Sequence, residues 1–417
     1  MMKRCVAALL LGISIVVVMS LPALADFDAA MRAYAEGDYA TAFREFKNDG
    51  SPEAQFNLGL MYFVGNGVKL DKREAANWYR KAADLGYASA QYNLGVMYSK
   101  GEGVEYDRKE SVKWYRKAAE LGHPAAQFNL GLLCDRGGDS VDQDRQEAAK
   151  WYRKAAEQGV VTAQFNLALL YDKEEGVGQD KKEALAWYRK AAEKGYAAAQ
   201  FNLALLYDKG DGVKQDKKEA LKWYRKAAGQ GYLPAQFNLG LLYDKGAVGK
   251  QDKKEAAVWY RKAADKGYAT AQLNLGLLYN KGEGVKQDRK EALKWFRRAA
   301  DKGVAAAQFN LGQIYGWGDG VTQDLKEAAS WYRKAADQGD ADAQFNLGTF
   351  YYNGLGVEKE LGEAAKWFLK AAEQGHPRAQ LKIGLMYDKG EGVKQDPMEA
   401  AKWYRKAAEQ VHRGMMP

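Results

Sequence analysis

The sequence has few of the residues that carry most catalytic, redox and metal chemistry. Its 417 residues include three histidines and two cysteines. Cys5 precedes an N-terminal apolar segment, so Cys134 has no partner for an internal disulfide. His123, His376 and His412 have no serine or cysteine partner at a useful spacing, and no cluster has metal-ligand spacing. We therefore expect no enzyme activity, no cofactor and no metal ion.

Proline is also scarce, and no part of the chain looks like a linker. The seven prolines are scattered, and no stretch is rich in serine. Charged residues make up 28% of the chain and the mean hydropathy is −0.55, which excludes a polytopic membrane protein. The sequence is thus typical of one continuous folded array.

The first 25 residues differ from the rest and predict a secretory signal peptide. Lys3 and Arg4 precede the apolar segment Val6–Leu21, and Ala23-Leu24-Ala25 fits the small-x-small cleavage rule. Cleavage after Ala25 would leave Asp26 first. An uncleaved anchor is the alternative, but the apolar segment is shorter than the roughly 20 residues of a spanning helix. We expect a periplasmic or secreted protein with no membrane span after cleavage.

The mature chain would remain basic. Removing Lys3 and Arg4 lowers the formal net charge from +9 by two, to +7, because the removed segment has no acidic residue. Acidic side chains are interleaved with the basic ones throughout. Nucleic acid is not an expected partner outside the cytoplasm, whereas an anionic envelope glycan or lipid head group could use such a surface.

One motif, Trp-Tyr-Arg-Lys-Ala-Ala or a close variant, recurs ten times. The spacing is 36 residues, except for 37 between Trp114 and Trp151. A fixed period of this size predicts a solenoid, in which each unit buries its apolar face against its neighbours. The tryptophans, which we expect to be structural, are Trp78, Trp114, Trp151, Trp187, Trp223, Trp259, Trp295, Trp331, Trp367 and Trp403.

Each unit has the pattern of two helices joined by a glycine-containing loop. In the first helix, apolar residues from Ala54 to Tyr62 follow helical spacing. Gly59 lies inside it although glycine costs about 1 kcal/mol there, and its equivalents change only to alanine, at Ala168 and Ala204. This glycine predicts a close helix contact.

The second helix begins with a predicted capping box, Asp71 and Glu74, which recurs through to Asp396 and Glu399. Its inward stripe from Ala75 to Ala83 is expected to pack on the first helix. A glycine then ends the helix in nine of the units.

Three motifs together resemble one repeat family. They are Ala-x-Phe-Asn-Leu-Gly-x-x-Tyr, the Gly-x-Gly-Val loop, and Glu-Ala-x-x-Trp-Tyr-Arg-Lys-Ala-Ala. They resemble the Sel-one-like repeat (SLR), a relative of the tetratricopeptide repeat with a slightly longer unit. The resemblance implies an all-α, right-handed superhelix with first helices on the concave side and second helices on the convex side, used mainly as an adaptor between proteins. A branch associated with β-lactam binding or hydrolysis has paired cysteines, which this chain lacks.

The predicted organisation has four parts. A signal peptide spans 1–25 and a helical cap 26–50, where Phe43 and Phe46 depart from the repeat pattern. Terminal units of a solenoid need an atypical outer face, which the cap would supply. The ten-repeat solenoid spans 51–410, and residues 411–417 form a tail.

Asparagines in the first helices are the first candidates for partner binding. Because asparagine is a weak helix former, its repetition needs a reason. One interpretation is a hydrogen bond to the backbone of the neighbouring unit, and the other is contact with a peptide in the concave groove. The column contains Asn57, Asn93, Asn129, Asn166, Asn202, Asn238, Asn274, Asn310 and Asn346, and ends with Lys382.

Two further features are candidate binding surfaces. The basic pair that follows the repeated tryptophans, such as Arg80-Lys81, points away from the inward stripe and is expected to be a solvated convex face. Trp317 lies outside the periodic set at a position that is usually charged, and Phe350 and Tyr352 follow in the next unit. These aromatics are candidate interface anchors, with local repacking as the alternative.

The sequence therefore predicts an exported SLR scaffold that binds proteins, as an adaptor or regulator in the bacterial cell envelope. The alternative is a cell-wall or exopolysaccharide-binding protein. A β-lactam-binding or hydrolysing protein is a more distant third.

Overall fold

The computed structural model describes residues 21–138, 141–173, 178–247 and 249–414. Residues 1–20 of the predicted signal peptide and 415–417 of the predicted tail lie outside this part. Within it there are 22 α-helices and no strands, with one isolated bridge between Gly138 and Val141. The chain forms two compact units, one of residues up to Ala199 with Asp211–Lys214, the other of Gln200–Gly210 with the residues from Gln215 onward.

Unit 1 contains the first ten helices. These are α1 (Leu21–Glu36), α2 (Tyr39–Asp49), α3 (Pro52–Val64), α4 (Lys72–Asp84), α5 (Ala88–Lys100), α6 (Arg108–Glu120), α7 (Pro124–Arg136), α8 (Arg145–Glu157), α9 (Val161–Asp172) and α10 (Lys181–Glu193). Helix α1 begins upstream of the predicted cleavage site at Ala25.

Unit 2 contains most of α11 (Ala197–Lys209) and the remaining helices. These are α12 (Lys217–Gly229), α13 (Leu233–Lys245), α14 (Lys253–Asp265), α15 (Ala269–Lys281), α16 (Arg289–Asp301), α17 (Ala305–Trp317), α18 (Leu325–Asp337), α19 (Ala341–Asn353), α20 (Leu361–Glu373), α21 (Pro377–Lys389) and α22 (Pro397–Gly414).

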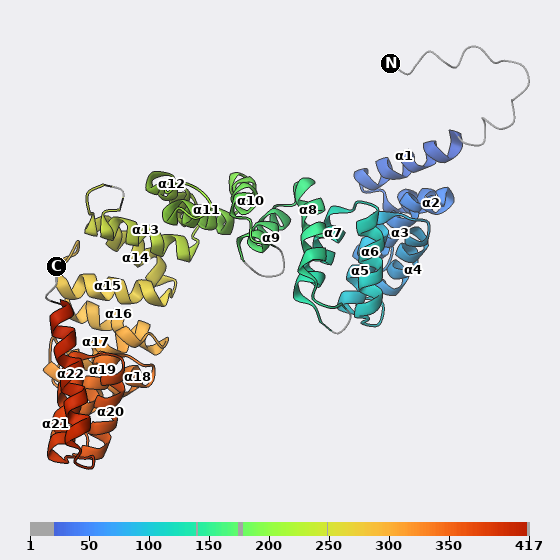
Figure 1. Ribbon diagram of the computed structural model, residues 1–417. Coiled ribbons are helices and arrows are strands. Elements are labelled where there is room, and N and C mark those ends of the chain that lie inside the picture. Colours follow the sequence, from blue (N-terminus) through green and yellow to red (C-terminus); the bar gives the residue numbers. More distant parts are fainter. Residues whose placement is uncertain (1–20, 139–140, 174–177, 248, 415–417) are drawn as a thin grey trace, which may run out of the picture. The chain divides into compact units, whose positions relative to one another are not determined.

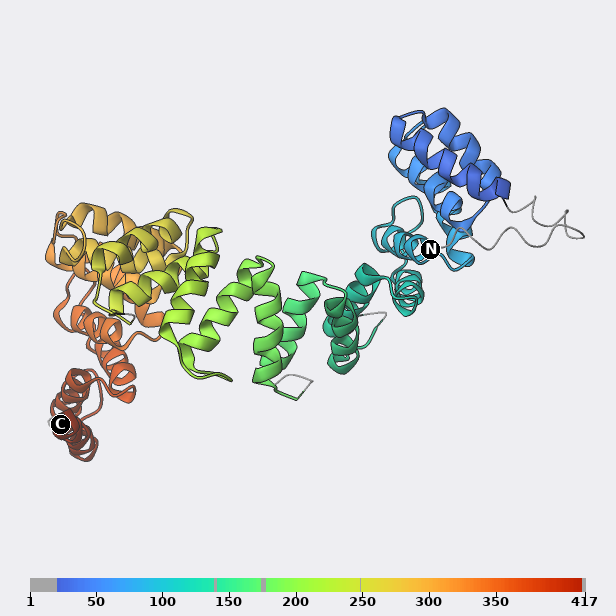
Figure 2. The same ribbon diagram turned by 90° about the horizontal axis from the view of Figure 1, so that it is seen from above.

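Helices that follow one another in sequence pack side by side within each unit (Figure 1, Figure 2). From α3 onward, the odd-numbered helices are the first helices of the repeats and are here called A helices. The even-numbered ones are the B helices. Within each unit, B helices pack on the A helices before and after them in the sequence, as α4 does with α3 and α5. This order of contacts confirms the predicted all-α solenoid of helix pairs.

The predicted aspartate caps start the B helices except α20, which Glu360 precedes, but the capping box is completed differently. Asp71 Oδ1 accepts hydrogen bonds from the backbone N–H groups of Arg73 and Glu74, at 2.9 and 3.0 Å. The Asp71 N–H donates to the Tyr62 carbonyl, 2.9 Å away in the A helix. It is therefore not available to Glu74. In five repeats the glutamate instead accepts from the tryptophan indole one turn later, as Glu183 does from Trp187 at 3.1 Å.

The glycine inside each A helix makes the predicted close contact. A Cβ on Gly59 would lie 2.7 Å from Tyr79 Cδ1, which is closer than carbon atoms normally approach. Tyr79 is buried against this bare helix surface and stacks at a tilt on Phe56. Because the obstacle is the edge of a ring, a small ring shift accommodates alanine in the units with Ala168 and Ala204.

The repeated tryptophans connect neighbouring repeats. Trp114 completes a core cluster formed by α4 of the preceding repeat and α5 of its own. Eight of the ten are buried at 3–8% exposure, and Trp78 and Trp259 are half-buried. The basic residue three positions later covers each ring, as Lys81 Nζ does 3.9 Å from the Trp78 ring centre.

The arginine of the basic pair is also part of the packing. Arg80 donates to the Tyr98 hydroxyl of the next repeat, and Arg153 donates to Tyr171 at 2.8 Å. These arginines therefore also bridge two repeats, while the side chain of Arg153 remains 41% exposed.

Candidate functional site

The asparagine column lies half-buried on the A helices and bonds mainly to tyrosines. Asn238 Nδ2 donates to Tyr224 Oη of the preceding B helix at 3.4 Å. Asn93 likewise lies against Tyr79, where burial raises the pKa of the phenol to about 12 and the asparagine partly offsets this rise. The same pairing joins Asn166 to Tyr152, Asn274 to Tyr260, and Asn346 to Tyr332.

This pairing corrects one predicted interpretation of the column. The asparagines do reach the neighbouring repeat, but the acceptor is a tyrosine side chain rather than the backbone. Asn57 and Asn310 instead bond to backbone carbonyls of their own helices, those of Glu53 at 2.8 Å and Ala306 at 2.6 Å. The hydroxyl is the available partner because the backbone of a packed B helix is already bonded internally.

Three of these asparagines line cavities that are copies of one site in successive repeats of unit 1. We call them the first, middle and third junction pockets, with volumes of about 290, 280 and 230 Å³. Each contains the column asparagine, two apolar residues one turn later, and the basic residue at the end of the A helix. These sets are Asn93, Val96, Met97 and Lys100; Asn129, Leu132, Leu133 and Arg136; and Asn166, Leu169, Leu170 and Lys173.

The middle and third pockets share walls. Leu132 and Arg136 line both of them. The pockets therefore form a row along the A helices of unit 1, in which each repeat contributes the same positions. Such a row can contact a chain-like ligand at several points, whereas a single pocket contacts one group.

One position distinguishes the three pockets chemically. It holds Phe63 in the first, Ser99 in the middle and Asp135 in the third. In the third pocket, Asp135 lies 3.4 Å from Arg145 and accepts from the Tyr152 hydroxyl at 3.5 Å. The first pocket is thus more aromatic, and the third has an internal ion pair.

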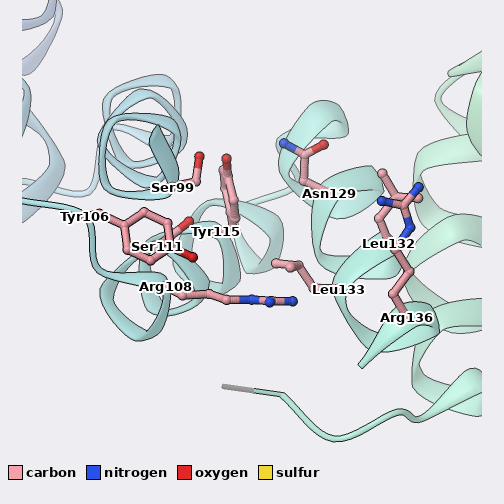
Figure 3. Close-up of a pocket in the computed structure, with 9 residues that line it drawn as sticks. All are labelled: Ser99, Tyr106, Arg108, Ser111, Tyr115, Asn129, Leu132, Leu133 and Arg136. Atoms are coloured by element: carbon pink, nitrogen blue, oxygen red, sulfur yellow. The ribbon is translucent and has the colours of Figure 1, made fainter. Parts of the chain in front are cut away.

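The middle pocket has two guanidinium groups and no lining carboxylate among the described residues (Figure 3). Arg108 extends from α6 toward α7, the helix that bears Asn129, Leu133 and Arg136. Ser99 Oγ donates to the Val96 carbonyl of its own helix at 2.7 Å, and Arg108 donates to the Gly137 carbonyl at 3.2 Å. The pocket is consequently rich in hydrogen-bond donors and positively charged.

The aromatic candidates in unit 2 differ in exposure and in their partners. Trp317 ends α17 and is 71% exposed. Tyr352 donates to Glu391 Oε2 at 2.7 Å, and Lys382 Nζ lies 4.9 Å from the centre of its ring.

Phe350 is in the core and is not a partner-binding residue in this structure. It is 8% exposed and its ring centre lies 5.3 Å from that of Tyr332 in an edge-on contact. The physical reason is its place in the repeat, since Met61, Met97 and Leu170 occupy the same buried position. Trp317 and Tyr352 keep the role of candidates.

Sequence reasoning missed a row of buried glutamines that joins the repeats. Gln127 Nε2 donates to the Ala119 carbonyl at the end of the preceding B helix, at 3.1 Å. Gln158, which follows the next B helix, donates to Gln127 Oε1 at 2.8 Å and to the Gly122 carbonyl at 2.9 Å. The signal was present in the sequence, because glutamine precedes the Phe-Asn or equivalent pair in every unit.

His123, His376 and Cys134 make structural contacts. His123 and His376 cap α7 and α21, each accepting through Nδ1 from a backbone N–H, at 3.3 and 3.1 Å. Cys134 is fully buried, and burial raises the pKa of its thiol to about 11. Among the described residues, no group of His, Cys, Asp and Glu could hold a metal ion, and no helix is long and apolar enough to cross a membrane.

Comparison with known proteins places this geometry in a family. The Sel1 repeat matches ten consecutive segments, 52–87, 88–123, 124–160, 161–196, 197–232, 233–268, 269–304, 305–340, 341–376 and 377–412. A search of the curated proteins found no match.

Two solved structures are similar over most of this chain. A protective antigen of uropathogenic Escherichia coli with an SLR fold is 40% identical, with a TM-score of 0.83 over 94% of this chain and 85% of that chain. A Sel1 repeat protein from Oxalobacter formigenes is 35% identical, with a TM-score of 0.60 over 72% of this chain and 87% of that chain. The ten matched segments and these similarities show that the chain belongs to the Sel1 repeat (SLR) family.

Proposed function

We propose that this protein is an exported scaffold that binds an extended segment of a partner protein along the A helices of unit 1, and so acts as an adaptor in the bacterial cell envelope. The observation that carries the proposal is the row of three junction pockets. Equivalent pockets in successive repeats suit a ligand that is itself a chain, because its side chains can enter one pocket after another.

The lining of the row favours a peptide over a uniform polymer. The first pocket contains Phe63, the middle one Ser99 and the third one Asp135. A polysaccharide of identical units would meet three different chemical environments at equivalent positions. A peptide with different side chains can match each of them.

Two findings support a location outside the cytoplasm. The N-terminal sequence has the charge, apolar segment and cleavage site of a signal peptide. The similar Escherichia coli protein is a protective antigen, a description that is compatible with exposure outside the cell.

The test is capture of partners from solubilised cell envelopes by the purified protein, compared with two variants. Leu132→Glu places a charge in the wall shared by the middle and third pockets. Leu121→Glu is the matched control, because Leu121 is 58% exposed and lines none of the junction pockets.

A protein that the wild type and Leu121→Glu capture, that Leu132→Glu loses, and that binds again when purified would support the proposal. Retention of only glycan, or capture unaffected by Leu132→Glu, would contradict it. Circular dichroism of all three proteins checks that the fold is unchanged.

A further inference from the structure

The middle junction pocket lacks a carboxylate that several other repeats have at the equivalent position; Phe63, Asn280, Gly316 and Tyr352 also replace it elsewhere. In repeats three to six, an aspartate near the end of the A helix faces the first basic residue of the B helix. The pairs are Asp135–Arg145 at 3.4 Å, Asp172–Lys181 at 2.7 Å, Asp208–Lys217 at 2.6 Å and Asp244–Lys253 at 2.5 Å. In repeat two the aspartate is replaced by Ser99, while the basic residue remains as Arg108.

The equivalent tyrosine also bonds to that aspartate in other repeats. Tyr188 donates to Asp172 at 3.2 Å and Tyr260 to Asp244 at 3.2 Å. The equivalent of these tyrosines in the middle pocket is Tyr115. The chain itself therefore shows that a carboxylate fits between this tyrosine and this basic residue.

Without the aspartate, the middle pocket has more free space, and the positive charge of Arg108 is not balanced by this residue. Leu133 is half-buried, although its equivalents Met97 and Leu170 are buried. The cavity of about 280 Å³ is large enough for an acidic side chain. Arg136, on the opposite helix, has no carboxylate partner among the described residues and adds a second guanidinium to the lining.

We propose that the middle junction pocket binds the side-chain carboxylate of an aspartate or glutamate in the partner peptide, in the place that the chain's own aspartate fills in other repeats. This inference rests on the proposed function and deepens it. Arg108 and Arg136 supply the charge, and Tyr115 and Asn129 supply neutral hydrogen bonds.

The flanking pockets decide between a side chain and a chain end as the source of the carboxylate. The first junction pocket lies on one side in the repeat order, and the third shares Leu132 and Arg136 with the middle one. A peptide that continues through all three pockets has an internal residue at the middle one. The acidic group is therefore a side chain and not the C-terminus.

The test selects binders for the purified protein from a display library of random linear peptides, and then measures the best peptides by fluorescence anisotropy. We expect the selected peptides to share an internal aspartate or glutamate. Changing that residue to glutamine should weaken binding about tenfold, because a hydrogen bond to a charged group contributes more than a neutral one. A peptide whose only carboxylate is the C-terminus should bind as weakly as the glutamine peptide.

Two substitutions of Ser99 give the sharpest variants. Ser99→Asp introduces the aspartate that repeats three to six have at this position, which would pair with Arg108 and occupy the pocket without disturbing the fold. Ser99→Asn has nearly the same shape but no charge. We expect Ser99→Asp to abolish the preference for glutamate over glutamine, and Ser99→Asn to retain it.

Removing the positive charges of the two arginines provides an independent test of the carboxylate pocket. Arg108→Gln with Arg136→Gln should bind glutamate and glutamine peptides equally. Lys281→Gln, at the position of unit 2 equivalent to Arg136, should behave like the wild type.

The outcomes separate the two proposals. Selected peptides without an acidic preference, or a preference that survives Ser99→Asp, would overturn the carboxylate pocket and leave the peptide scaffold standing. Failure to select any peptide would contradict both the carboxylate pocket and the peptide scaffold. Tighter binding of a phosphoserine peptide, with glutamate no better than glutamine, would assign the pocket to phosphate and also refute the inference.

Discussion

Leu121→Gln should stabilise the junction between the first and second repeats. Gln91 is 4% exposed and donates to the Ala83 carbonyl at 2.9 Å, but its Oε1 atom is buried without a partner. At the next junction the equivalent oxygen, on Gln127, accepts from Gln158 at 2.8 Å. Leu121 occupies the position of Gln158 and is 58% exposed, so its replacement removes little packing.

The magnitude follows from the bond that is gained. A net hydrogen bond contributes about 1 kcal/mol, and satisfying a buried acceptor can contribute somewhat more. The new glutamine could also donate to the Gly86 carbonyl, as Gln158 does to that of Gly122. Long repeat arrays do not unfold in one step, so the effect should be read locally. About 1 kcal/mol corresponds to roughly fivefold slower hydrogen exchange in α5 and α6.

The assay is hydrogen exchange with mass spectrometry, with two comparison variants. Leu121→Glu has the same length as glutamine but no N–H donor, and it should give no protection. Gln158→Leu removes the bond at the next junction and should speed exchange in α7 and α8. If Leu121→Gln and Leu121→Glu exchanged at the same rate, the unpaired oxygen of Gln91 would not be costing stability and the reasoning would be wrong.

Three further predictions test the packing, the aromatic candidates and the thiol. Gly131→Val should destabilise the packing of α7 on α8 by about 2 kcal/mol, because its side chain overpacks against Tyr152. Gly131→Ala should cost less, because Ala168 is native at the equivalent position. Hydrogen exchange in α7 and α8 compares the two variants. Phe350→Ala should lower stability by about 3 kcal/mol, because it truncates a core side chain. Trp317→Ala should change stability by less than about 0.5 kcal/mol and, if Trp317 is an anchor, should reduce partner capture. Equal decreases in melting temperature for the two variants would refute the burial argument. Burial raises the pKa of Cys134 to about 11, so the folded state keeps a proton that the unfolded chain loses above about pH 9. Between pH 9 and 11, the stability of the wild type should therefore fall by about 2 kcal/mol more than that of Cys134→Ala. The same dependence of stability on pH in both proteins would contradict this prediction.

Much of the fold could be predicted from the sequence because each element is specified locally. The aspartate cap, the helix-ending glycine and the apolar spacing recur in each unit, and local rules convert them into helices. The close contact at Gly59 was also predictable, since only small residues occur at its position. A feature repeated ten times is averaged over ten contexts, which makes such predictions robust.

The site could be predicted only in part, because its chemistry depends on which side chains meet across repeats. The asparagine column was singled out correctly as unusual, but its tyrosine partner lies in the preceding repeat. Phe350 was misassigned because an aromatic looked exceptional, although its position matches Met97 and Leu170. Ser99 carries no recognisable signal in the sequence, because a missing aspartate is informative only once Arg108 and Arg136 are known to face the same cavity.

The sequence by itself determined the helix pair, its period and the order of packing, because these follow from contacts within a unit or between units adjacent in the chain. Tertiary structure alone decided that Gln91 has an unpaired oxygen, that the arginines bridge repeats, and that three junction pockets lie in a row. The physical reason is that hydrogen bonding, burial and charge pairing depend on distances between side chains. A serine at position 99, where several other repeats have aspartate, changes the hydrogen bonding, the burial and the charge pairing without altering the helical pattern.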